Sequence, residues 1–174
     1  MKKLCLFSVV FVSVIFHSLV IAQEGAIATI DLNTAIRASD YSLKQYKVLQ
    51  ADEYYKQLIA TIEQTRSDLE KLQKEGETKS LTWSDEEKQA HRQKGQQKYA
   101  ELNNLAQQEA GVRSRLDSSV QKELAPTVET IVNAIIDEKG IGLLLNSQAV
   151  YFRTADFDIT EELVKRLNKA GSDK

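Results

Sequence analysis

The chain contains 174 residues, of which 23 are basic and 25 are acidic, and its formal net charge at pH 7 is −2. A mildly acidic chain of this length corresponds to about one ordinary domain, and its charge argues against nucleic-acid binding. The single proline and the seven glycines favour long regular elements over a loop-rich fold.

Residues 1–22 have the features of a secretory signal peptide. Lys2 and Lys3 precede an apolar run from Leu4 to Ala22, and the run ends in small or aliphatic residues. This pattern predicts export and cleavage after Ala22. The alternative is a retained membrane anchor, because the run approaches the length that spans a bilayer.

Cleavage after Ala22 would remove Cys5 and leave a mature chain without cysteine, which excludes disulfides and thiol chemistry. It would also remove Lys2 and Lys3 from the 23 basic residues. The mature chain would then carry 21 basic and 25 acidic residues, a net charge of −4.

A strand and a short helix are predicted at the start of the mature chain. Residues 26–31 alternate small or polar side chains with aliphatic ones, as a strand does. Residues 32–38 can form a short helix or a turn, which Asp31 is placed to cap. Ser39 and Asp40 are a start signal for the first long helix.

The first long helix is predicted from about Tyr41 to the segment at residues 76–80, where Gly76 and a polar stretch end it. It carries an apolar stripe with alternating steps of three and four residues. The intervening positions are mostly charged or amide side chains, which is typical of a coiled-coil face. At about 1.5 Å per residue the helix would span about 50 Å. The stripe consists of Val48, Ala51, Tyr55, Leu58, Ile62, Thr65, Leu69 and Leu72.

A return helix is predicted from Ser84 to Lys139. The Ser84 side chain can cap it, and the acids that follow suit the positive end of the helix dipole. Pro126 lies inside this helix and predicts a bend, because an interior proline removes one backbone hydrogen bond. Gly140 ends the helix.

Two further strands and a final helix are predicted after Gly140. Residues 141–145 and 149–153 are apolar and are predicted to form strands, joined by a turn at 146–148. Residues 158–168 are predicted to form the last helix.

The predicted fold class is α+β, with a long antiparallel helical hairpin projecting from a small β body. The hairpin, here called the prong, comprises residues 41–126 and has its tip near residues 76–84. The body comprises residues 23–40 and 127–170. Its short strands would leave unpaired edges and too small a core, so the body is expected to associate with other copies.

We expect no catalytic, cofactor or metal site. His91 is the one histidine of the mature chain, and its place on a charged helix favours a solvated residue over a catalytic one. The glycines at residues 140–142 precede a strand, which is the wrong order for a dinucleotide fingerprint. The acids at 85–87 could chelate a hard cation, but a helix N-terminus accounts for them.

Aromatic side chains are the first group of binding candidates. Trp83 and Leu81 lie at the hairpin turn, where they either meet an unfolded chain or pack the turn. Tyr46 and Tyr54 lie off the stripe, where they either line a cavity wall or pack against the return helix. Amphipathic rings suit weak contacts with an extended peptide.

Basic residues near the tip are the second group. Between Lys71 and Lys98 there are seven basic and five acidic residues, a local charge of +2. Such a charge would favour electrostatic capture of an acidic partner. The candidates are Lys79, Lys88, Arg92, Lys94 and Lys98.

Three short stretches, taken with the order of the elements, resemble one known family. They are residues 27–33 (IATIDLN), residues 140–145 (GIGLLL) leading to Ala149-Val150-Tyr151, and residues 158–160 (DIT). On these residues the whole chain resembles the Skp/OmpH family of periplasmic chaperones, which hold unfolded outer-membrane proteins without ATP.

The resemblance implies a homotrimer in which three prongs surround a cavity for the client. It leaves contact with lipopolysaccharide or a membrane surface open. Well-known members are strongly basic, whereas this mature chain is acidic, so weaker electrostatic capture is expected. The body residues expected at the trimer contact are Ile27, Ile30, Leu143, Leu145, Val150 and Phe152.

The alternative function is a structural coiled-coil spacer or adaptor of the cell envelope that binds one folded partner. A spacer would need a continuous apolar stripe. Here Thr65 and Glu109 interrupt the stripe, and Gly95 and Gly111 weaken the return helix. These interruptions favour the chaperone.

Overall fold

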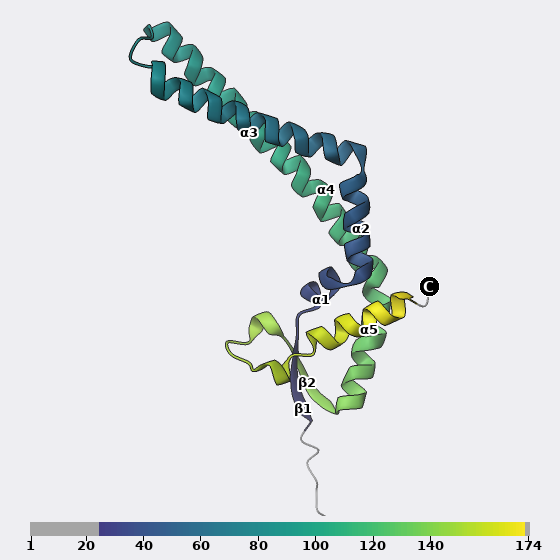
Figure 1. The fold of residues 1–174 in the computed structure, drawn as a ribbon. Coiled ribbons are helices and arrows are strands. Elements are labelled where there is room, and N and C mark those ends of the chain that lie inside the picture. The colour runs from purple at the N-terminus through teal and green to yellow at the C-terminus, as the bar shows by residue number, and fades with distance from the viewer. Residues whose placement is uncertain (1–24, 173–174) are drawn as a thin grey trace, which may run out of the picture.

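The computed structural model describes residues 25–172, so the predicted signal peptide and its cleavage point lie outside the described residues. The described part consists of a body with a two-stranded sheet and a long helical prong that projects from it (Figure 1). Among the described residues, no helix has the length and hydropathy needed to cross a bilayer.

The sheet pairs the two ends of the described chain. Strand β1 (Ala26–Ile30) lies parallel to strand β2 (Ile141–Asn146), with Ile27 opposite Leu143. On its other side β1 makes an isolated parallel bridge from Thr29 to Asp158. β1 therefore lies in the middle, and it confirms the predicted first strand.

The predicted strand at residues 149–153 is wrong. The chain forms a 3-10 turn, η1 (Ser147–Ala149), then an irregular loop and a second turn, η2 (Ala155–Phe157). The Arg153 guanidinium donates to the Asp158 carboxylate at 2.7 Å and to the Ser147 carbonyl at 3.3 Å. These bonds close the loop on itself, so it does not pair with β2.

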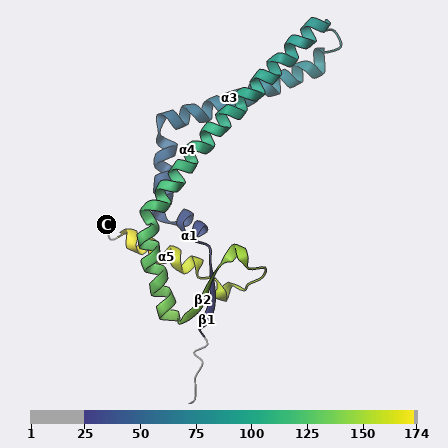
Figure 2. The same cartoon turned by 180° about the vertical axis from the view of Figure 1, so that it is seen from behind.

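The helices of the body pack on one face of the sheet. Helix α1 (Leu32–Ala38) begins at Asp31, whose carboxylate accepts from the Thr34 amide at 2.9 Å, as predicted. Helix α5 (Thr160–Ser172) lies across α1 and the end of the return helix (Figures 1 and 2). It extends four residues beyond the predicted end at residue 168.

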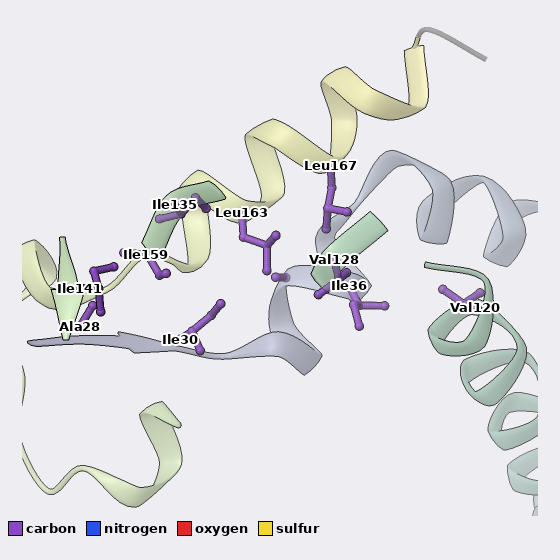
Figure 3. Close-up of a cluster of buried hydrophobic side chains, with 11 residues drawn as sticks. Ala28, Ile30, Ile36, Val120, Val128, Ile135, Ile141, Ile159, Leu163 and Leu167 are labelled. Carbon is purple, nitrogen blue, oxygen red and sulfur yellow. The ribbon is translucent and has the colours of Figure 1, made fainter. Parts of the chain in front are cut away.

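Eleven buried apolar residues form one cluster where these elements meet (Figure 3). Ile135 and Leu163 are fully buried at its centre. The strands contribute Ala28 and Ile30 from β1 and Ile141 from β2. The return helix contributes Val120, Val128 and Ile135, which follow one another toward the body. The cluster consists of Ala28, Ile30, Ala35, Ile36, Val120, Val128, Ile135, Ile141, Ile159, Leu163 and Leu167.

The first limb of the prong is two helices, not the single helix that was predicted. Helix α2 (Asp40–Ala51) starts at the Ser39 cap, and helix α3 (Glu53–Lys79) follows after one residue. Asp52 has extended dihedrals, φ −65° and ψ 133°, and its carboxylate accepts from the Tyr55 amide at 2.9 Å. The helix restarts because this N-cap satisfies the free amides of a new first turn.

Helix α3 runs through Gly76 and ends at Lys79, within the polar segment at residues 76–80 that was predicted to end the first limb. The return helix α4 (Asp85–Lys139) starts at the predicted Ser84 cap, with a full capping box to Glu87. It ends at Gly140, which has φ +60°.

Pro126 lies inside α4, which runs through it as one helix. Figures 1 and 2 show that α4 changes direction between its part in the prong and its part in the body. The kink at Pro126 itself remains a prediction.

The apolar stripe holds the outer part of the prong together. Leu58, Ile62, Thr65 and Leu72 are buried on α3, facing α4. The prediction fails for Val48, which is 60% exposed, and for Ala51. The break at Asp52 changes the direction of the chain, so the stripe of α2 no longer faces the return helix.

Candidate functional site

The tip of the prong is a packed turn built around His91. Its Nε2 lies 2.9 Å from the Leu72 carbonyl oxygen, and its ring lies 4.6 Å from the Trp83 ring, centroid to centroid. A Cβ on Gly76 would come within 3.2 Å of His91 Cε1, so glycine gives the imidazole room. Trp83 thus packs the turn, and His91 is a structural residue rather than a solvated one.

Leu81 is the apolar residue that the tip exposes, with 96% of its surface accessible. It follows the end of α3, in the short turn that the Trp83–His91 contact closes. This leucine therefore offers apolar surface to solvent at the far end of the prong.

The predicted basic residues of the tip fall into two groups. Lys79 pairs with Glu75 at 3.2 Å, Lys88 pairs with Asp85, and Lys98 lies between Asp68 and Glu101. The hydrogen bond to Glu101 raises the pKa of Lys98. Arg92 and Lys94 are exposed on α4.

Charge is divided unequally between the prong and the rest of the mature chain. The prong, residues 41–126, carries 14 basic and 14 acidic side chains. The rest of the mature chain, residues 23–40 and 127–174, carries seven basic and eleven acidic side chains. The net −4 expected of the mature chain therefore belongs to the body, and the prong is neutral.

The tyrosines of the first limb differ in their surroundings. The Tyr46 hydroxyl donates to the Asp117 carboxylate, and this bond, aided by burial, raises the pKa of the phenol. Tyr55 donates to Glu109 at 2.8 Å, and burial raises its pKa. Tyr46 thus packs against the return helix, whereas Tyr54 is 58% exposed.

Exposed apolar residues lie on the two strands and on the loop that follows β2. Ile27 and Leu143 are half exposed and face each other across the two strands. The loop after β2 adds Tyr151 and Phe152, both largely exposed, and Phe157. We call these five residues the body patch.

The other residues predicted at the trimer contact lie elsewhere. Ile30 is buried in the core of its own chain, while Leu145 and Val150 are partly buried. Among the described residues, β2 pairs only with β1, so its second edge carries unpaired backbone groups. The exposed sheet face and this edge adjoin each other.

The structure places no cluster of three or more His, Cys, Asp or Glu side chains suited to a metal ion within residues 25–172. A hollow of about 370 Å³ lies between α2, α4 and the end of α5, and is lined in part by Tyr41, Leu124 and Leu167.

The model of the family described as "Outer membrane protein (OmpH-like)" matches residues 26–167. The chain belongs to this OmpH-like family. The match covers both strands, the prong and most of α5.

Among solved structures, the chain is similar to an OmpH-like outer membrane chaperone from Caulobacter crescentus CB15. The two are 16% identical with a TM-score of 0.48, over 84% of this chain and 85% of that one. No curated protein matches this sequence.

Proposed function

We propose that this protein is an ATP-independent periplasmic holdase, which binds unfolded outer-membrane proteins between the prongs of a homotrimer. The observation that carries the proposal is the OmpH-like family match over residues 26–167. The prong adds to it, because a long hairpin free of the body can only act by contact with something outside its own chain.

Self-association through the body is the first part of the proposal. The body patch exposes five large apolar residues beside an open strand edge. Both features are costly in water and are relieved when a second copy covers them. A head-to-tail contact of this kind closes into a ring when the rotation between copies allows it.

Client binding along the prongs is the second part. Leu81 and Tyr54 expose apolar surface, and Arg92 and Lys94 add positive charge near the tip. Many weak contacts of this sort in several prongs give strong retention without one essential residue. No nucleotide is required, because the client leaves by folding into the membrane.

The holdase proposal is tested by aggregation. An outer-membrane protein diluted from urea should scatter less light when the mature chain is present at one trimer per client. Unchanged scattering at this ratio contradicts the holdase and favours the envelope spacer.

The trimer is tested by sedimentation equilibrium at micromolar concentration. We expect three copies in the wild type and single copies in Leu143→Glu, because a charge would be buried in the contact. Leu81→Glu, which adds the same charge at the distant tip, is the matched control and should stay trimeric. A monomeric wild type overturns the assembly.

The contribution of charge is tested by Arg92→Glu combined with Lys94→Glu. Client capture at low salt should slow, and the difference should shrink as salt screens the charges. Lys165→Glu with Lys169→Glu makes the same change in charge on α5 of the body and should leave the rate unchanged. Equal rates in all three proteins would show that tip charge has no role.

A further inference from the structure

The base of the prong contains a hollow that the proposed function does not use. It has a volume of about 370 Å³ and lies where the start of α2, the part of α4 around Leu124 and the end of α5 come together. Figures 1 and 2 show the end of α5 close to α4 and to the start of α2. We call this cavity the base hollow.

The walls of the base hollow are held in place by the body. Leu167, on α5, is 5% exposed, and Ser39, which caps α2, is 1% exposed. The Asp40 amide donates to the Asn168 side-chain oxygen at 2.9 Å, which ties the start of α2 to α5. Because these walls are already ordered, a ligand that enters the hollow loses little of its binding energy to ordering them.

The inner surface of the base hollow is mostly apolar and comes from three helices. It includes Tyr41, Leu124, Thr127, Leu167 and Ala170. A cavity of about 150 Å³ can hold a benzene ring, so the base hollow has room for a phenol or indole ring together with part of a peptide backbone. The Tyr41 side chain is partly accessible and offers its ring for contact with another aromatic ring.

Charged side chains of both signs also line the base hollow. Asp40, Lys44 and Glu123 are exposed, and within residues 25–172 none of these three side chains has an ion-pair or hydrogen-bond partner. The two carboxylates can accept from a phenol O–H or an indole N–H, and the ammonium can donate to a peptide carbonyl. Tyrosine or tryptophan in an extended peptide presents a ring, a side-chain donor and a carbonyl together, whereas an aliphatic residue lacks the first two.

We propose that the base hollow binds one tyrosine or tryptophan side chain of an extended peptide. Tyr41 contacts its ring, Asp40 and Glu123 accept from its polar end, and Lys44 donates to a neighbouring peptide carbonyl. The source of the peptide rests on the proposed holdase function: it is the client, because transmembrane β-barrels carry girdles of aromatic residues at both membrane interfaces. The base hollow then anchors the client at the end of the prong opposite to Leu81.

Binding is tested with N-acetyl-tyrosinamide, a single aromatic residue with a peptide group on each side. Added to the isotope-labelled mature chain, it should shift the backbone amide signals of Lys44, Thr127 and Ala170 and leave those of the tip unchanged. We expect saturation with a dissociation constant on the order of 1 mM, because the ligand is small. N-acetyl-leucinamide should bind at least about fivefold more weakly, because it has no ring and no side-chain donor.

Two pairs of variants assign the binding to the base hollow. Tyr41→Ala should weaken it at least about fivefold, because the ring contact is lost. Tyr99→Ala, the same change at an exposed position on the prong, should leave it unchanged. Lys44→Trp should abolish binding, because the added ring fills the hollow, whereas Lys47→Trp places the same ring outside the hollow and should have no effect. Lys44 and Lys47 are both exposed, so both variants should fold.

Three results would overturn the proposal: no saturable shift around the base hollow, equal affinity for the tyrosine and leucine derivatives, or unchanged binding in Tyr41→Ala and Lys44→Trp. None of these results bears on client holding, because light scattering measures that activity without the small ligand.

Discussion

The body and the prong of this chain are stabilised in different ways. The body closes around eleven buried apolar residues drawn from both strands and from α1, α4 and α5. In the prong, Ser42 and Val120 are buried next to the body, and beyond them there is a line of buried residues along α3 and polar bonds near Asp52. Buried apolar contacts are therefore concentrated in the body, while the prong carries exposed apolar side chains such as Leu81 and Tyr54.

The largest expected effect comes from the centre of the body. Leu163→Ala should lower the free energy of unfolding by about 2–5 kcal/mol, because a fully buried leucine leaves a cavity. Leu43→Ala removes the same atoms from a half-exposed position on α2 and should cost less than about 1 kcal/mol. Urea denaturation followed by circular dichroism measures the free energy of unfolding of both variants. Equal losses of stability would contradict the difference between the body and the prong.

A cavity in the prong should have a smaller and more local effect. Ile62→Ala removes one buried stripe residue and should cost about 2 kcal/mol, at the low end for such substitutions. Amide hydrogen exchange should accelerate in α3 and in the part of α4 facing it, while the body amides stay protected. Acceleration spread equally over the body would mean that the two regions unfold as one unit.

The tip offers a probe of its own, because Trp83 is the single tryptophan of the chain. His91→Ala removes the bond to the Leu72 carbonyl and the ring contact with Trp83, which should cost about 1 kcal/mol. Trp83 emission should shift to longer wavelength and be quenched more easily by iodide. Gln89→Ala, an exposed change on the same helix, should leave the emission as it is.

The smallest effect should be acid sensitivity of the body. Arg166 lowers the pKa of Glu138, and Lys139 together with Arg166 lowers that of Glu162. Their stabilisation is complete above the ordinary glutamate pKa of 4.5 and is lost as the pH falls through the lower folded values. Glu138→Gln should flatten the fall in melting temperature below pH 4.5, and an unchanged slope would contradict this assignment.

Local signals predicted much of this fold. The caps Asp31, Ser39 and Ser84 each start a helix, because a side-chain oxygen satisfies amides within three residues. Leu58, Ile62, Thr65 and Leu72 of the stripe are buried as their spacing indicates, and Leu69 is partly buried. These features depend on neighbours in the sequence, and such neighbours can be recognised without knowing the fold.

The wrong predictions have two causes. Either two sequence patterns in the same segment indicated different structures, or the structure depends on a contact with a residue far away in the sequence. Asp52 followed by Glu53 is itself a helix-start signal, but the apolar spacing that runs through it concealed the break. The segment at residues 149–153 has the composition of a strand, yet the Arg153–Asp158 pair folds it back. The Tyr46–Asp117 bond spans 71 residues, so nothing near Tyr46 could show that its ring was engaged.

The parallel pairing of β1 with β2 also fixes an order of events during synthesis. The Thr29 hydroxyl bonds to the Phe157 carbonyl, 128 residues later in the chain. The hairpin of α3 and α4 can form early from nearby residues, whereas the sheet must await nearly the entire polypeptide and the entropy cost of closing so long a loop. A copy that lacks its last twenty residues keeps both strands but loses Ile159, Leu163 and Leu167, so we expect its body to stay open to solvent and sensitive to proteases.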